Sequence, residues 1–141
     1  MNHADRARLS EDVQDAEGWR PKAYQDSVGV WTVGYGTNLQ ELIIDTTLGA
    51  RWLAEGLASA EREAERAFPW YAEASPRRQR AIVELIYNMG LPRLLGFRDT
   101  LAACAGGRWH VAAAELLDSK WAGQVGPTRA NRIAAMLREG R

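Results

Sequence analysis

The sequence predicts a mainly helical α+β fold, with a small β-structured segment near the amino terminus of an otherwise helical chain. Its 141 residues, 46% of them hydrophobic, are enough to bury the core of one domain. Residues 20–38 alternate aromatic and β-branched residues with glycine, serine and aspartate, which is typical of a hairpin or small twisted sheet. From about residue 46 onward, apolar residues recur at steps of three and four, as in helices. We therefore expect one bilobed domain over residues 1–141.

The chain begins with a segment that is predicted to be a short helix. Leu9, Val13 and Ala16 are spaced at roughly helical intervals, and Gly18 is a natural helix stop, so the helix is expected to end at Glu17.

A small β lobe is expected next, over about residues 18–45. It contains the hairpin or twisted sheet, and at most one further short strand at residues 42–44, where Leu, Ile and Ile follow one another.

A long helix over about residues 46–68 is predicted to connect the two lobes. Asp45 or Thr46 can accept the free amide hydrogens at its start, and Pro69 ends it. At 1.5 Å per residue such a helix is about 33 Å long, enough to span a small domain. Its tryptophan and leucine residues are expected to lie in the core.

The remaining residues, about 69–141, are predicted to form a helical lobe together with the N-terminal helix. Ser75 as a cap and Pro76 at the first helical position open a helix that stops at Gly90. Shorter helices are expected in three further places: after Phe97, from about Arg108 to Asp118, and from Pro127 to about Glu139.

The zero net charge argues against partners that are attracted by the electrostatic field of the molecule as a whole. Eighteen basic and 18 acidic side chains give a formal net charge of zero, so we expect no binding to nucleic acid and no stable insertion into a membrane. The charges are nevertheless divided, because residues 1–75 carry an excess of about six acidic groups and residues 76–141 an excess of about six basic ones. Recognition must therefore come from a local site.

Cysteine and histidine offer little chemistry. Cys104, the single cysteine, has apolar neighbours and is expected to be a small buried residue rather than a reactive thiol. His3 and His110 have no metal-ligand spacing. We expect no metal and no cofactor.

Two carboxylates and a hydroxyl are the candidate catalytic groups. Glu17 ends the first helix, Asp26 falls in the expected hairpin turn, and Thr32 lies on the returning strand. Hydrolysis of a glycosidic bond needs an acid that protonates the leaving oxygen and a second carboxylate that assists a water or attacks directly. A glutamate at a helix end and an aspartate in a turn are also ordinary structural placements, so the spacing alone leaves both interpretations open.

The same stretch continues a longer pattern. It resembles the phage-type lysozymes and endolysins, glycoside hydrolase family 24, and residues 81–101 and 108–138 are similar to the central and C-terminal helices of that family. The matching positions in the site region are Glu17-Gly18, Lys22-Ala23-Tyr24, Asp26 and Trp31-Thr32-Val33-Gly34-Tyr35-Gly36.

This resemblance implies a lysozyme-like fold and a muramidase that cuts the β-1,4 bond between N-acetylmuramic acid and N-acetylglucosamine in peptidoglycan. Glu17 is then the general acid, with Asp26 and Thr32 holding the attacking water. The resemblance also implies inversion of the anomeric centre, which corresponds to carboxyl groups about 6.5–9.5 Å apart.

Five further residues take their roles from the resemblance alone. Arg129 is expected to form a supporting ion pair with the catalytic glutamate. The expected substrate-binding residues are Gly36, Asn38, Tyr87 and Thr100.

Two other functions stay open at this point. A lytic transglycosylase needs the acid but no pair of groups to hold a water, and a non-catalytic peptidoglycan-binding or virion module needs neither. The partners expected are peptidoglycan glycan strands, and the chain is expected to be a monomer. Because the N-terminal residues contain no apolar run of signal-peptide length, we expect an endolysin that is made in the host bacterial cytoplasm and reaches the wall through a holin lesion.

Overall fold

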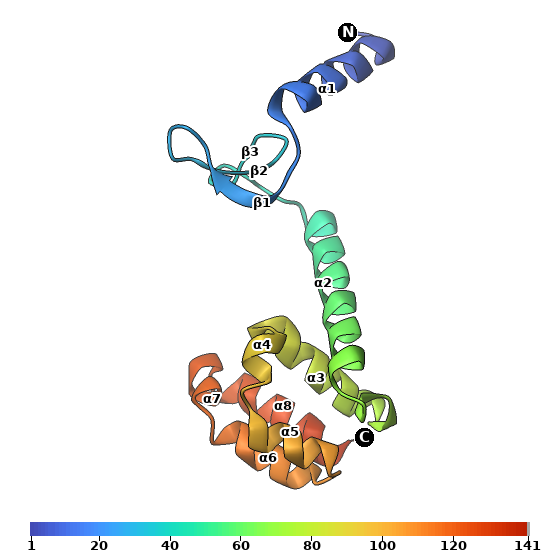
Figure 1. Ribbon diagram of the computed structural model, residues 1–141, viewed down its shortest axis with the longest axis vertical. Helices are drawn as coiled ribbons and strands as arrows, with labels where there is room; N and C mark the ends of the chain where they lie inside the picture. Colours follow the sequence, from blue (N-terminus) through green and yellow to red (C-terminus); the bar gives the residue numbers. More distant parts are fainter. Residues whose placement is uncertain (141) are drawn as a thin grey trace. The chain divides into compact units, whose positions relative to one another are not determined.

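A computed structural model describes residues 1–140 of the chain (Figure 1). The described residues form eight α-helices, a short 3₁₀ helix and one three-stranded antiparallel sheet, which confirms the predicted α+β, mainly helical fold. The chain divides into two compact units, an N-terminal unit Met1–Thr46 and a helical unit Thr47–Arg141.

The N-terminal unit starts with α1 (His3–Glu17), which ends where the sequence predicts. The Asn2 side chain caps it by accepting a hydrogen bond from the Asp5 amide at 2.9 Å. Gly18 follows with φ of +69°, a conformation that glycine adopts without strain, and its amide closes the last helical turn on Gln14.

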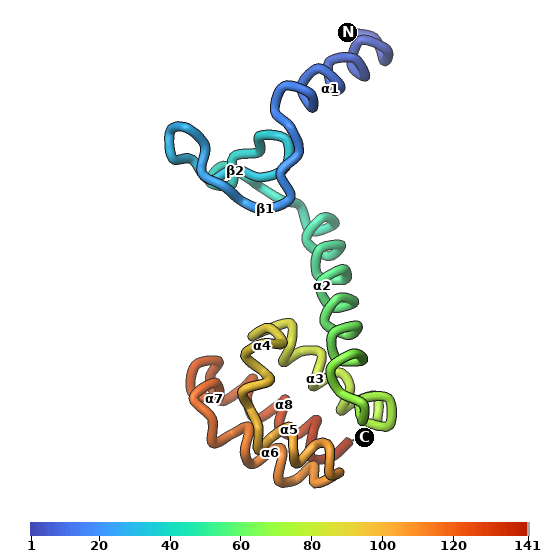
Figure 2. Tube along the Cα trace, viewed as in Figure 1, coloured from blue at the N-terminus to red at the C-terminus, as the bar shows by residue number. Residues whose placement is uncertain are grey.

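The sheet has the order β1 (Arg20–Gln25), β2 (Trp31–Gly34) and β3 (Thr37–Asn38). Figure 2 traces the backbone through this segment, with β1 and β2 labelled. The predicted strand at Leu42–Ile44 is wrong. The chain reverses directly after β2 and forms β3, which begins five residues before the expected strand, because Gly34 and Gly36, with φ of +67° and +76°, permit a tight turn.

The helical unit begins with most of α2 (Thr46–Ala67), close to the predicted bounds. Its buried residues are small, Ala60 and Ala64. The expectation that the large apolar residues of this helix lie in the core fails for Trp52 and Leu53, which are 49% and 46% exposed.

The helix α3 (Pro76–Met89) also has the predicted bounds, from Pro76 to the stop at Gly90. Ser75 occupies the predicted cap position with an extended backbone, but its side chain makes no capping hydrogen bond. Its hydroxyl oxygen is buried without a hydrogen-bond partner among the described residues.

Shorter helices make up the rest of the helical unit, and the sequence predicts three of them. It does not predict the two shortest α-helices, because four to six residues are too few for a helical period to be visible. The elements in chain order are η1 (Tyr71–Glu73), α4 (Leu91–Leu94), α5 (Arg98–Ala105), α6 (Trp109–Leu117), α7 (Lys120–Val125) and α8 (Pro127–Glu139).

One hydrophobic cluster forms the core of the helical unit. Trp121 is its largest fully buried side chain, and Cys104 is 2% exposed, as expected. The other fully buried large residues are Ile82, Leu85, Leu94, Leu116, Ile133 and Leu137. Among residues 1–140, no helix combines the length and the apolar character that a membrane span requires.

Arg78 connects the start of α3 to the end of α8. Its guanidinium donates hydrogen bonds to the carbonyl oxygens of Leu137 at 2.8 Å and Arg138 at 3.3 Å, and lies 4.5 Å from the centre of the Trp109 ring. It therefore satisfies carbonyl groups at a helix C-terminus and places a positive charge at the negative end of the helix dipole. Gly140 lies so close that a Cβ there would be 2.5 Å from the guanidinium carbon.

Candidate active site

Glu17 is the last residue of α1, and its carboxyl group lies against the backbone of Gly36. A Cβ atom built on Gly36 would be 2.6 Å from Glu17 Oε2 and 2.8 Å from Glu17 Cδ, closer than real Cβ contacts. The φ of +76° at Gly36 is a second reason for glycine at this position. The motif residue Gly36 therefore leaves the space that the Glu17 carboxyl occupies.

Asp26 lies in the turn between β1 and β2, where backbone groups fix its side chain. Its Oδ1 accepts hydrogen bonds from the amides of Val28 at 2.9 Å and Val30 at 2.8 Å. The Asp26 amide in turn donates to the Val30 carbonyl at 3.0 Å. These contacts form the local side-chain turn for which aspartate is favoured, and they set the direction of the carboxylate.

Thr32 is the one buried residue of the N-terminal unit, with 5% of its surface exposed. Its hydroxyl donates a hydrogen bond to the Val30 carbonyl at 3.1 Å. Asp26 and Thr32 are thus both bonded to Val30, one to its amide and both to its carbonyl, so the hairpin brings these two candidate residues together.

Asn38 is paired with Thr32 across β2 and β3. Its Oδ1 accepts a hydrogen bond from the Gln40 amide at 2.9 Å and so stabilises the turn that follows β3. Five of the residues predicted for the site therefore come from the N-terminal unit: Glu17, Asp26, Thr32, Gly36 and Asn38.

Two aromatic rings close to Glu17 and Gly36 in the sequence form a pair that was not predicted. Trp19 and Tyr35 have ring centres 5.1 Å apart and planes inclined by 50°. They are 62% and 42% exposed, respectively. The sequence signal was present, because Trp19 directly follows the motif residue Gly18 and Tyr35 is itself a motif position, but alternation along the hairpin does not show which rings meet.

Tyr87 and Thr100 lie in the helical unit and line separate pockets. Tyr87, on α3, is 48% exposed and lines a pocket of about 750 Å³ between α2 and α3. Thr100, on α5, is 2% exposed and lines a pocket of about 390 Å³ with Glu115 and Ser119. Within the helical unit these two predicted substrate contacts therefore belong to different surfaces.

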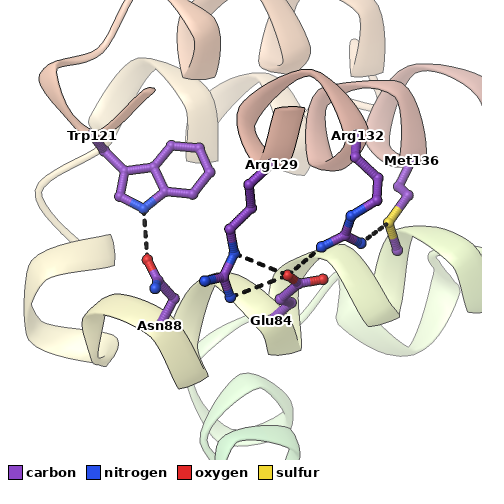
Figure 3. A network of polar contacts seen from close by, with 6 residues as sticks. All are labelled: Glu84, Asn88, Trp121, Arg129, Arg132 and Met136. Atoms are coloured by element: carbon purple, nitrogen blue, oxygen red, sulfur yellow. Dashed lines mark hydrogen bonds and ion pairs between the residues drawn. The ribbon is translucent and has the colours of Figure 1, made fainter. Parts of the chain in front are cut away.

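Arg129, on α8, forms an ion pair with Glu84 of α3 (Figure 3). Glu84 Oε1 accepts hydrogen bonds from Arg129 Nε at 3.2 Å and from Arg132 at 2.5 Å. Arg132 also approaches the Met136 sulfur at 3.6 Å. Glu84 was not among the residues predicted for the site, and the pairing of Arg129 with Glu17 stays a prediction.

The two guanidinium groups favour the charged form of Glu84. Burial raises the pKa of this carboxyl, but the hydrogen bonds and charges of Arg132 and Arg129 outweigh that effect, so the pKa of Glu84 is lowered overall. Glu84, Arg129 and Arg132 together carry one negative and two positive charges, so the three side chains have a net positive charge.

One helical turn beyond Glu84, α3 makes a second polar contact with a later helix. The Trp121 indole nitrogen donates a hydrogen bond to Asn88 Oδ1 at 2.8 Å (Figure 3). The fully buried indole thereby satisfies its one polar atom, as buried tryptophans require.

The described residues contain no group of three or more histidine, cysteine, aspartate or glutamate side chains that could hold a metal ion.

A family model, phage lysozyme, matches residues 14–135, which include all the elements from the end of α1 to most of α8. The chain belongs to the phage lysozyme family. It is also similar to a probable T4-type lysozyme 1 of Dictyostelium discoideum, with 24% identity over 153 residues that cover 88% of this chain and 89% of the relative. The chain is therefore a lysozyme, a glycoside hydrolase whose substrate is peptidoglycan.

Proposed function

We propose that this lysozyme hydrolyses the β-1,4 bond between N-acetylmuramic acid and N-acetylglucosamine with inversion, using Glu17 as general acid and Asp26 with Thr32 to position the water. The observation that carries the proposal is that Asp26 and Thr32 are both hydrogen-bonded to Val30, while Gly36, in the turn between β2 and β3, leaves room for the Glu17 carboxyl.

Glu17 protonates the leaving oxygen of the glycosidic bond. Its position at the carboxyl end of α1, against the bare backbone of Gly36, limits the directions that the carboxyl can take. Since the transition state resembles an oxocarbenium ion, proton transfer to the leaving group lowers the barrier as the bond breaks.

Asp26 and Thr32 hold the attacking water. Thr32 uses its proton in the bond to Val30, so its oxygen lone pairs face the hydrogen atoms of a water. Both backbone amides that bind Asp26 do so at Oδ1, which leaves Oδ2 free to act as the base. It removes one proton from the water, while the other proton of the water is hydrogen-bonded to the Thr32 oxygen. The oxygen of the water attacks the anomeric carbon as the leaving oxygen departs with the Glu17 proton.

Product analysis on purified peptidoglycan tests this reaction. The wild type should release reducing muramic acid ends of inverted configuration, and Glu17→Gln should lower the rate by about 10²- to 10⁴-fold, the usual contribution of a general acid. Glu11→Gln, an exposed position on the same helix, is the matched control and should keep full activity. Release of 1,6-anhydro ends would identify a lytic transglycosylase, and binding to walls without turnover would identify a non-catalytic module.

We further propose that the enzyme acts as an endolysin, made in the host cytoplasm and released to the wall by a holin. Its membership in a phage lysozyme family supports this role. Expression in bacteria with and without a co-expressed holin tests it, with lysis expected only in the holin-containing cells. Equal lysis in both cultures contradicts the proposal.

A further inference from the structure

The exposed aromatic residues Trp19 and Tyr35 pair with each other and come from the two chain segments that meet at Glu17 and Gly36. Trp19 follows Glu17 by two residues, and Tyr35 directly precedes Gly36, whose backbone faces the Glu17 carboxyl. The pair is thus continuous with the site through two independent chain segments. This continuity distinguishes it from an apolar patch elsewhere on the surface.

The rings are held in place on one side and open on the other. A Cβ built on Gly34 would lie 3.4 Å from Trp19 Cζ3, so the indole lies beside the space that a side chain at position 34 would occupy. The ring contact between Trp19 and Tyr35 fixes the second edge. The exposed 62% of Trp19 and 42% of Tyr35 then present preformed apolar surface beside a polar turn.

The other aromatic residues of the hairpin do not offer such a surface next to the acid. The guanidinium of Arg20 covers the ring of Tyr24, 4.4 Å from its centre. Trp31 precedes the catalytic candidate Thr32 on β2, and successive side chains of a strand point to opposite faces, so Trp31 lies on the face away from the Thr32 hydroxyl.

We propose that Trp19 and Tyr35 form a sugar-binding platform, a subsite at which one pyranose ring of a β-1,4-linked N-acetylated glycan stacks next to the bond to be cut. An aromatic ring offers a flat apolar face at low entropy cost, which suits the C–H face of a sugar, and the tyrosine hydroxyl can bind a sugar hydroxyl. The inference rests on the proposed function for the identity of the glycan. It assigns a binding role to residues outside the catalytic trio.

Leucine substitutions separate stacking from simple packing. Trp19→Leu keeps apolar bulk beside Gly34, and Tyr35→Leu keeps an apolar side chain at position 35, but each removes a flat ring, whereas Trp19→Phe keeps a ring. Trp31→Leu is the matched control, since it removes an aromatic of similar exposure, 47%, from the other face of the strand. Binding of chitotetraose, a linear tetramer of β-1,4-linked N-acetylglucosamine, is measured by calorimetry. For each variant, kcat and KM are measured on purified peptidoglycan, and the unfolding temperature is measured by thermal denaturation.

We expect Trp19→Leu and Tyr35→Leu each to raise the Kd and KM by about tenfold, the size of one good aromatic contact, with kcat nearly unchanged. Trp19→Phe should recover most of the affinity, and Trp31→Leu should bind as the wild type does. An unchanged Kd in both leucine variants overturns the inference, as does an equal loss in Trp31→Leu. A loss that Trp19→Phe shares, accompanied by a lower unfolding temperature, assigns the pair a structural role and also overturns it.

The same experiment distinguishes the two proposals. A wild type that binds the tetramer in a Trp19-dependent way but releases no products contradicts the proposed reaction and leaves the platform intact. A wild type that cleaves peptidoglycan with a KM independent of Trp19 and Tyr35 contradicts the platform and leaves the reaction intact.

Discussion

In the N-terminal unit a single described residue, Thr32, is buried, whereas the helical unit buries a continuous apolar cluster that includes Leu85 and Trp121. The N-terminal unit is ordered by backbone turns: two amides hold Asp26, and positive-φ glycines shape the turn at Gly36. The candidate catalytic groups thus belong to the unit with little core. Substitutions in the helical unit should therefore change stability, and those in the N-terminal unit should change activity.

The largest effect should come from opening a cavity in the helical core. Leu85→Ala removes a fully buried side chain and should lower the free energy of unfolding by about 2–5 kcal/mol, as measured by denaturant or thermal unfolding. The activity per folded molecule at low temperature should not change. Val28→Ala, at a residue 79% exposed in the N-terminal unit, is the control and should change stability by less than about 0.5 kcal/mol.

The next largest effect should come from Gly36→Ala, which should lower the activity much more than the stability. The new Cβ collides with the Glu17 carboxyl, and a displacement of about 1 Å can cost roughly 100-fold in kcat/KM. The control Gly107→Ala has a similar positive φ, +67°, and nothing within 4 Å of the new Cβ. Both variants bear the backbone strain, but only Gly36→Ala should lose activity; equal activity in the two would show that Gly36 does not position Glu17.

A smaller effect on stability is expected at Arg78. Arg78→Met keeps the length of the side chain but leaves two carbonyl groups near the end of α8 without their charged donor, which should cost about 1–3 kcal/mol. Arg80→Met, at an exposed arginine of the same helix, is the control and should be nearly neutral. Equal unfolding temperatures for the two variants would show that the Arg78 contacts do not stabilise the fold.

The smallest effect should be that of Glu84→Gln, and it should depend on pH. The pKa of Glu84 is lowered in the folded state from an ordinary value of 4.5, so its ion pairs stabilise the fold above about pH 4.5 and this stability is lost as the pH falls through the lower folded pKa. Because Arg129 and Arg132 are 38% and 53% exposed, we expect at most about 1 kcal/mol at pH 7. Unfolding curves of wild type and variant should converge at acidic pH, and a constant difference would contradict this origin.

The sequence predicts those elements whose ends carry a local signal. The start of α3 at Pro76 and its stop at Gly90 are examples, because proline and glycine act on the backbone directly. The strand expected at Leu42–Ile44 was wrong because a run of β-branched residues forms no strand without a partner. The edge of β2 that could have paired with it is already paired with β3, which follows the turn at Gly36.

The catalytic candidates were visible for the same local reason, and their neighbours were not. Asp26 and Thr32 are held by contacts within four residues, which spacing along a hairpin can reveal. The pair of Glu84 with Arg129 joins residues 45 positions apart, and a chain with 36 charged side chains allows too many such pairs for the sequence to select one.

The buried Cys104 makes the enzyme convenient for site-specific labelling. Burial raises the pKa of this thiol to about 12, so at pH 8 very little of it is the reactive thiolate. A cysteine introduced at the exposed Val28, two residues from Asp26, would therefore take up a thiol-directed fluorophore alone, without removal of the native cysteine. Such a dye would place a fluorescent probe on the hairpin turn that holds Asp26.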